Sequence, residues 1–178
     1  MRTLDQLLLL IGLASCAAPQ PQPRGADRAP IGLHVEADGG EAAALPRAAT
    51  CEGAGSAPAI GWGPLPAGAV ELLLLVRARS GALHWSAWGI PADQNGLPAG
   101  IVAEQAPPLQ GLNEAGIIGW LAPCRPPSPV DDELLMQIIA LREPLRAPPT
   151  TGVDELLRRA EPLIIGQGEL RLPIWTDR

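Results

Sequence analysis

Hydrophobic and polar residues alternate along several short stretches of this chain, with the period of two that β-strands show. The alternation predicts half-buried strands over residues 31–35, 83–90 and 170–174. Residues 70–76 are almost wholly apolar, which is typical of a short central strand buried on both faces. Together these patterns predict a domain rich in β-structure.

Other stretches are shorter or less regular. Residues 58–62 form a short extended piece, and residues 134–141 are predicted as a strand, with a helix as the alternative. Residues 91–122 carry many Gly and Pro residues and are expected to be largely loop. Within residues 83–90, the alternation places Trp85 and Ala87 on the opposite face from His84, Ser86 and Trp88.

One helix is predicted, over residues 152–160. Thr151 and Asp154 have the spacing of a capping-box pair, and Pro162 limits the helix at its other end. The apolar residues of this stretch share one face: Val153, Leu156, Leu157 and Ala160. Many strands and one late helix make a mainly β fold.

Composition agrees with this fold class. The chain has 178 residues, enough for one domain, and 47% of them are hydrophobic. It has no Phe, no Tyr and five Trp, so the core must be largely aliphatic. Pro (21) and Gly (20) are abundant, which favours a loop-rich β domain over a helix bundle. A net charge of −6 without a basic stripe argues against nucleic-acid binding and against attachment to membranes through a polybasic patch.

The N-terminus resembles the signal peptide of a bacterial lipoprotein. Arg2 precedes an apolar run at residues 7–14 that is too short to span a bilayer, and the run ends in Leu13-Ala14-Ser15-Cys16, which matches a lipobox. We therefore expect residues 1–15 to be removed and Cys16 to carry the lipid, including fatty-acyl chains such as palmitate. An ordinary secretory signal with a chance cysteine is the alternative.

The anchor predicts a place in the cell. Residues 16–30 are rich in Pro, Gln, Ala and Arg and are expected to form an extended tether between the lipid and the domain at residues 31–178. Ala17 follows the cysteine, with no Asp at that position to retain the protein in the inner membrane. We expect the periplasmic face of the outer membrane, with the membrane contacted through the lipid anchor.

Two cysteines remain, Cys51 and Cys124. An even number in an oxidising compartment suggests a disulfide, and two buried free thiols are the alternative. No zinc site is expected, because two cysteines without paired histidines do not supply four ligands.

Several short motifs lie in a specific order along residues 31–178. They are Asp38-Gly39-Gly40, Thr50-Cys51-Glu52-Gly53, residues 58–62, Leu65-Pro66-Ala67-Gly68, His84-Trp85, Gly89-Ile90-Pro91-Ala92-Asp93, Gly96-Leu97-Pro98, Gly111-Leu112-Asn113-Glu114 and Pro123-Cys124. In this order they resemble the phosphatidylethanolamine-binding protein family, in its bacterial Raf-kinase-inhibitor-like branch. The resemblance implies a β-sandwich-like fold of two antiparallel sheets with a C-terminal helix.

The resemblance also implies a pocket for a small anion such as a phosphate headgroup. In the family this pocket is built by a D-P-D-x-P loop, the histidine of H-W, a G-G-P turn and a G-x-H-R-Y segment. Here only His84 remains. The D-P-D-x-P loop is absent, Leu121-Ala122-Pro123 replaces G-G-P, and Asp132-Glu133-Leu134 replaces H-R-Y.

The candidate ligand-binding residues are therefore His84, Trp85, Ala122, Pro123 and Asp132. A carboxylate at Asp132 would repel an anion. The pocket is accordingly either vestigial or altered in its ligand preference.

Catalytic motifs do not appear. Neither histidine has a G-x-S-x-G nucleophile motif near it, and Asp131-Asp132-Glu133 fits a solvated charge run better than a metal or general-base cluster. Nothing in the sequence points to an enzyme, a metal or a cofactor. Two hypotheses follow: a periplasm-facing lipoprotein that binds a small anion or lipid headgroup around His84, or a protein-interaction or scaffold domain with a vestigial pocket.

Overall fold

The computed structural model describes residues 28–37, 40–103, 106–124 and 132–174. Predictions for residues 1–15, for Cys16 and for Asp131 lie outside this part of the chain. The elements are β1 (Ala29–Pro30), β2 (Leu33–Ala37), β3 (Gly40–Glu41), β4 (Ala59–Trp62), β5 (Glu71–Ala78), β6 (Leu83–Pro91), β7 (Gly96–Leu97), β8 (Leu109–Gln110), β9 (Glu133–Leu141), α1 (Val153–Ala160) and β10 (Ile164–Pro173), with 3-10 turns at Arg47–Ala49 and Glu161–Leu163.

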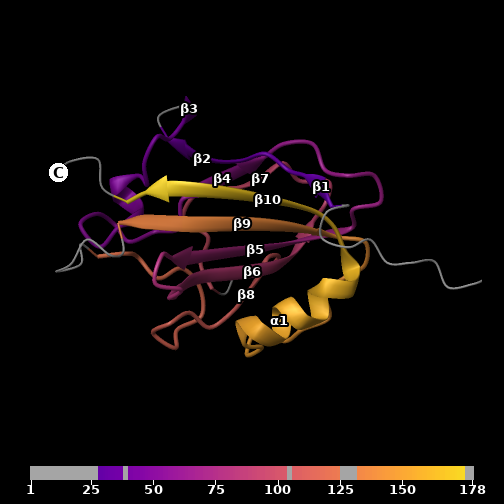
Figure 1. Ribbon diagram of the computed structural model, residues 1–178. Coiled ribbons are helices and arrows are strands. Elements are labelled where there is room, and N and C mark those ends of the chain that lie inside the picture. Colours follow the sequence, from indigo (N-terminus) through magenta and orange to yellow (C-terminus); the bar gives the residue numbers. More distant parts are fainter. Residues whose placement is uncertain (1–27, 38–39, 104–105, 125–131, 175–178) are drawn as a thin grey trace, which may run out of the picture.

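The strands form two sheets. The large sheet has the order β1-β10-β9-β5-β6-β8, and the small sheet has the order β3-β2-β4-β7. Every pairing is antiparallel except that of β1 with β10. Helix α1 lies against the large sheet (Figure 1). The predicted mainly β, two-sheet fold with a helix near the C-terminus is confirmed.

Alternation along β5 separates two hydrophobic cores. Leu72 and Leu74 join the core between the two sheets, where Ile60 of the small sheet also lies. Leu73 joins the core on the other face, where Leu156 of α1 packs. Both faces of β5 are therefore covered, as its apolar run predicted, and the fold has three layers.

A β-bulge in β6 lets residues on both sides of the bulge face the core between the two sheets. Leu72 pairs with Ile90 and Leu74 with Ala87, so β6 carries one extra residue between these pairs. Gly89 sits there at φ 69°, a conformation that glycine adopts without strain. As a result Ile90 faces the core between the sheets together with Ala87, while Trp88 faces α1. The predicted division of Trp85 and Ala87 from Trp88 is confirmed.

The helix lies where it was predicted, at Val153–Ala160, but its cap differs from the prediction, and the last strand begins earlier than predicted. Gly152 occupies the N-cap position of α1 without a side-chain hydrogen bond, so the predicted capping box of Thr151 and Asp154 is wrong. Strand β10 begins at Ile164, not at residue 170, because Gly166 and Gly168 interrupt the visible alternation. A Cβ at Gly168 would overlap the Ile31 carbonyl, so glycine permits a close backbone approach there.

The folded domain begins before residue 31. Ala29 pairs with Gly166, and Arg28 Nη1 donates to Gln167 Oε1 at 3.2 Å. The last three residues of the predicted tether therefore lie on the edge of the large sheet. Within the described residues, no helix combines the length and apolar character needed to cross a membrane.

Candidate functional site

His84, near the start of β6, is fixed by the segment of residues 120–124. Its Nδ1 lies 2.7 Å from the Leu121 carbonyl oxygen, and the Leu121 N–H donates to the His84 carbonyl at 2.8 Å. Because a carbonyl oxygen only accepts, Nδ1 must carry the hydrogen and donate it. Among the described residues, the other ring nitrogen, Nε2, has no hydrogen-bond partner, and the His84 side chain is half-buried.

Trp120 covers the other side of His84. The two ring centroids are 6.4 Å apart, and Trp120 meets the ring of Trp85 edge-on at 5.9 Å. Trp85 is fully buried, with its Nε1–H donating to Gln110 Oε1 at 2.7 Å. Trp85 therefore supports the site from beneath, and Trp120, which the sequence analysis did not select, forms part of its surface.

The predicted disulfide between Cys51 and Cys124 is present. Their Cα atoms are 5.2 Å apart, and the Cys51 N–H donates to the Pro123 carbonyl at 3.1 Å. Both cysteines lie at the surface, so the alternative of buried free thiols is wrong. Pro123 is buried and Ala122 half-buried, and both follow Leu121, the residue that is hydrogen-bonded to His84.

Local hydrogen bonds explain why the two loops hold this shape. The Thr50 hydroxyl donates to the Arg47 carbonyl at 2.9 Å and accepts from the Glu52 N–H at 3.2 Å, which closes the turn before the disulfide. Asn113 accepts from the Ile117 N–H through its side chain and donates to the Gly119 carbonyl, which closes the loop before Trp120. These are turn-forming uses of Thr and Asn side chains.

The structure does not bring Asp132 to this site. Strand β5 lies between β9 and β6, and in register Leu83 pairs with Arg77, which pairs with Leu135. Asp132 is thus two strands across and three residues along from Leu83. Strands are spaced by about 4.8 Å, so the lateral separation alone is roughly 10 Å. The binding role predicted for Asp132 stays a prediction without support from its position.

Glu133, the other described residue of the run Asp131-Asp132-Glu133, does not belong to a metal site among the described residues. Glu133 forms an ion pair with Arg171, in which Glu133 Oε1 lies 3.1 Å from Arg171 Nη1. Among the described residues, no three His, Cys, Asp or Glu side chains gather closely enough to hold a metal ion.

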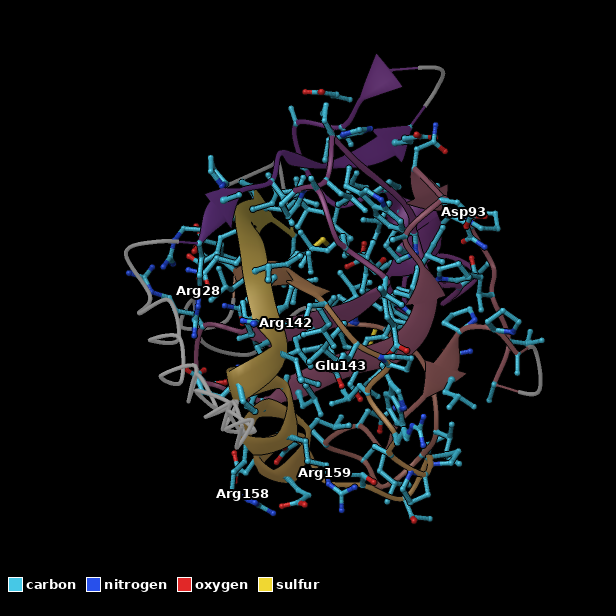
Figure 2. The ribbon with its side chains drawn as sticks, turned by 90° about the vertical axis from the view of Figure 1, so that its right-hand side faces the viewer. Arg28, Asp93, Arg142, Glu143, Arg158 and Arg159 are labelled. Atoms are coloured by element: carbon cyan, nitrogen blue, oxygen red, sulfur yellow. A yellow bond between two sulfur atoms is a disulfide. The ribbon has the colours of Figure 1, made fainter. Side chains whose placement is uncertain are left out.

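Two adjoining hollows lie at the other end of β6. One has a volume of about 450 Å³ and is lined by Trp62, Pro66 and Gln94 among others, and the second, of about 470 Å³, shares Ala69 and Ala92 with it. Neither is lined by His84. Asp93, on the second hollow, lies well apart from Arg28 and Arg142 in Figure 2. No pattern in the sequence pointed to these hollows, which are lined largely by loop residues.

A buried carboxylate, also not foreseen, joins two segments at the end of β6 that is far from His84. Glu71 is 8% exposed, and its Oε1 accepts from the N–H groups of Gly89 at 3.0 Å and Leu145 at 3.2 Å. Burial raises the pKa of this carboxyl, and the two backbone hydrogen bonds oppose the rise. Glu71 is a structural clamp between the β6 bulge and the loop that leads to α1.

Comparison with known proteins decides the family. The sequence model of the family described as phosphatidylethanolamine-binding protein matches residues 36–174. The chain belongs to this family. Related UPF0098 proteins include one from Methanothermobacter thermautotrophicus, 28% identical over 71% of this chain and 87% of that protein, and one from Pyrococcus abyssi, 30% identical over 71% and 75%.

Solved structures of phosphatidylethanolamine-binding protein relatives agree. A homologue from Chlamydia trachomatis, described as putative, superposes with a TM-score of 0.71 and 25% identity, over 83% of this chain and 98% of that one. Escherichia coli YbcL, described as a member of the mammalian family, superposes with a TM-score of 0.67 at 18% identity, over 83% and 99%, and shows the shared fold. The family fold is thus kept around a His84 site held by Trp120 and a disulfide.

Proposed function

We propose that this member of the phosphatidylethanolamine-binding protein family is a lipid-anchored protein of the bacterial cell envelope that binds a small ligand at His84. The observation that carries the proposal is the His84 ring itself. One nitrogen is anchored to Leu121, and no described residue forms a hydrogen bond with the other. A preorganised polar atom next to an aromatic ring favours binding, because little freedom is lost when a ligand arrives. We propose no catalytic step.

Binding is tested by thermal shift on the full chain carrying Cys16→Ser, with phosphate, phosphoethanolamine, carboxylates and simple amines. We expect a saturable rise in Tm with at least one of these, since a ligand that binds only the native state stabilises it by mass action. The rise should vanish in His84→Ala and persist in His34→Ala. His34 is a matched control because it lies on the small sheet, between Glu36 and Glu41. Identical responses in both variants would contradict the proposal.

The lipid anchor at Cys16 has its own test. Cells that express the chain are grown with labelled palmitate and then separated into membrane and soluble fractions. The unaltered chain should be labelled and membrane-bound, whereas Cys16→Ser should be unlabelled. Cys124→Ser should keep the label, which controls for loss of a cysteine as such. A labelled Cys16→Ser chain would refute the anchor.

A second candidate function, protein interaction, is favoured by a different observation. The loop before Trp120 exposes large apolar side chains, with Ile117 61% exposed and Leu112 39% exposed around the bridge from Leu112 to Ile118. Exposed apolar groups that gather on one loop are typical of contact surfaces. Crosslinking in envelope extracts tests this reading. A specific product lost in Ile117→Ser but kept in His84→Ala would support it.

A further inference from the structure

The two hollows at the end of β6 that is far from the histidine adjoin each other and form one groove. They share Ala69 and Ala92 in their linings, and most of the lining residues are apolar. Val70, on the second hollow, is 48% exposed. Among the described residues, the lining carries a single charged side chain, that of Asp93. We call this feature the proline groove, after three of its lining residues: Pro64, Pro66 and Pro91.

Backbone and indole groups tie the two walls of the proline groove together. The Ala92 N–H donates to the Val70 carbonyl at 3.2 Å, and the Trp62 indole donates to the Gln94 carbonyl at 2.9 Å. The exposed side chains of Gln94 and Asn95 lie on the first hollow, and an amide both donates and accepts. An apolar groove with amides beside it suits an uncharged, proline-rich peptide better than an ion.

The described part of the chain begins beside the proline groove. Ala29 of β1 pairs with Gly166, and a Cβ built on Gly166 would lie 2.8 Å from Pro66 Cγ and 3.0 Å from the Ala29 carbonyl oxygen. The N–H of Gly63, another lining residue, donates to the Gly32 carbonyl at 3.0 Å. Residues 29–32 therefore adjoin the wall of the groove, and the chain that precedes them joins the domain there.

Arg28 fixes the point at which the chain joins the domain. Its side chain is 12% exposed, and its Nη2 lies 2.6 Å from Glu161 Oε1 while its Nη1 donates to Gln167 Oε1. One partner follows α1 and the other belongs to β10, so the guanidinium connects β1 to both elements. Residues that shortly precede Arg28 consequently stay close to the groove.

The sequence before Arg28 has the composition that such a groove recognises. Pro19, Pro21 and Pro23 alternate with two glutamines. Proline-rich segments favour the polyproline II conformation, which rises about 3.1 Å per residue, and bind in apolar grooves. Pro23 and Pro19 stand five and nine residues before Arg28, which corresponds to about 15 and 28 Å in this conformation. Asp93, on the second hollow, lies well apart from Arg28 in Figure 2, so only residues several positions before Arg28 can fill the groove along its length.

A segment that is joined to the domain beside a groove needs little affinity to occupy it. A short connection gives such a segment an effective concentration in the millimolar range. A groove that binds the free peptide with a millimolar Kd is then occupied about half of the time or more. The same segment on a second copy competes only at the concentration of the protein itself. An open groove therefore favours the segment of its own chain.

We propose that residues 19–23 bind in the proline groove of their own domain. The proline rings cover Val70 and Ala92, and the neighbouring side-chain amides pair with peptide groups of the segment. The inference goes beyond ligand binding at His84 and depends neither on that site nor on a lipid at Cys16. Its consequence is a shortened span between residue 16 and the domain, with the groove end of the domain turned toward residue 16.

Paramagnetic broadening in ¹⁵N NMR tests this placement. The full chain carries Cys16→Ser and Ala18→Cys, with a nitroxide attached at position 18. We expect the amide signals of Ala69 and Ala92 to lose about half of their intensity or more, relative to the same chain with the nitroxide reduced. Replacing the three prolines at positions 19, 21 and 23 by glycine should restore these signals about twofold, because the segment then no longer favours the bound conformation.

Two exposed valines provide a matched pair of variants. Val102 is 57% exposed, as an open surface residue comparable to Val70, but it lines neither hollow. Val70→Ser should reduce the broadening at Ala92 by about half, whereas Val102→Ser should leave it unchanged. Surface substitutions of this kind have small effects on stability, and circular dichroism checks that both variants stay folded. Equal broadening in the two variants would contradict the proposal.

The remaining outcomes decide between the segment of the same chain and other occupants. Equal broadening in the proline chain and its glycine variant would overturn the proposal. So would broadening that requires a second, nitroxide-bearing copy, which is detected by mixing it with an isotope-labelled copy that has no nitroxide. A free Pro-Gln-Pro-Gln-Pro peptide should shift the signals of Ala69 and Ala92 in the glycine variant and bind more weakly to the unaltered segment. A peptide that shifts neither signal in the glycine variant would count against the groove as its site.

Discussion

The Glu71 carboxyl holds its proton to a higher pH in the folded protein than in the unfolded chain. Burial raises its pKa above the ordinary value of 4.5, against the pull of the hydrogen bonds from Gly89 and Leu145. The stability that this group contributes is therefore complete below the unfolded pKa and is lost as the pH rises through the folded one.

Glu71→Gln should remove this loss, because an amide oxygen can accept the same two hydrogen bonds without becoming charged. We expect the difference in unfolding free energy between the variant and the unaltered chain to grow in favour of the variant as pH rises from about 4 to about 8. The growth is at most about 1.4 kcal/mol per pH unit. Urea denaturation at several pH values measures this. The exposed Glu169→Gln variant is the control, and parallel pH profiles for all three proteins would contradict the prediction.

Gln110 is a buried polar residue with both ends of its amide engaged. It accepts from the Trp85 indole and donates to the Val102 carbonyl, each at 2.7 Å. Gln110→Leu would leave the buried indole N–H without a partner, which costs about 1–3 kcal/mol. Urea denaturation checks it against Gln137→Leu, whose amide is at the surface and whose loss should cost less than about 0.5 kcal/mol. Equal losses of unfolding free energy in the two variants would show that the buried hydrogen bond stabilises the fold no more than the surface one.

At the scale of elements, the disulfide is the strongest single constraint on the site. Cys51 and Cys124 are 73 residues apart in sequence, so their bond closes a long loop. The double variant Cys51→Ser, Cys124→Ser should lose about 4 kcal/mol of unfolding free energy in the chain-entropy model. Guanidinium denaturation of the oxidised protein and the variant measures the loss. A change below about 1 kcal/mol would mean that the reduced chain keeps the two loops together without the bond.

Elements whose pattern is strong could be predicted, and those whose pattern glycine breaks could not. The apolar run of β5 and the alternation of β6 were enough to predict that both elements are strands and where they lie in the sequence. The first half of β10 did not, because Gly166 and Gly168 fill positions where a side chain would meet Pro66 or Ile31. The N-cap of α1 failed for a related reason: several polar residues could have capped the helix, and Gly152 does so without a side chain.

Some residues of the candidate site could be predicted from the sequence, and others could not. His84 and the cysteine pair could be selected because the family resemblance and the even cysteine count pointed to them. Trp120 could not, since its relation to His84 depends on a loop folding back onto β6. Asp132 was selected by aligning motifs, and the strand order then placed β5 between it and His84.

At the scale of the whole molecule, the two-sheet β architecture and the family could both be predicted from sequence; the structure confirmed the first and the comparisons the second. The anchor at Cys16 and the place in the envelope are proposals that the palmitate experiment decides. The described domain accounts for neither, because both depend on the first residues of the chain.

The outermost strands of both sheets share a feature: β1, β8, β3 and β7 are each two residues long. Loops extend their cover, since Ile31 donates to Gln167 beside β1, and Glu114 and Leu121 donate to Leu83 and His84 along β6. Among the described residues, these short strands and the loops beside them leave less of the sheet edges open to a strand from another copy. Copies of the domain should therefore remain separate molecules in concentrated solution, even at densities where proteins with open sheet edges would aggregate.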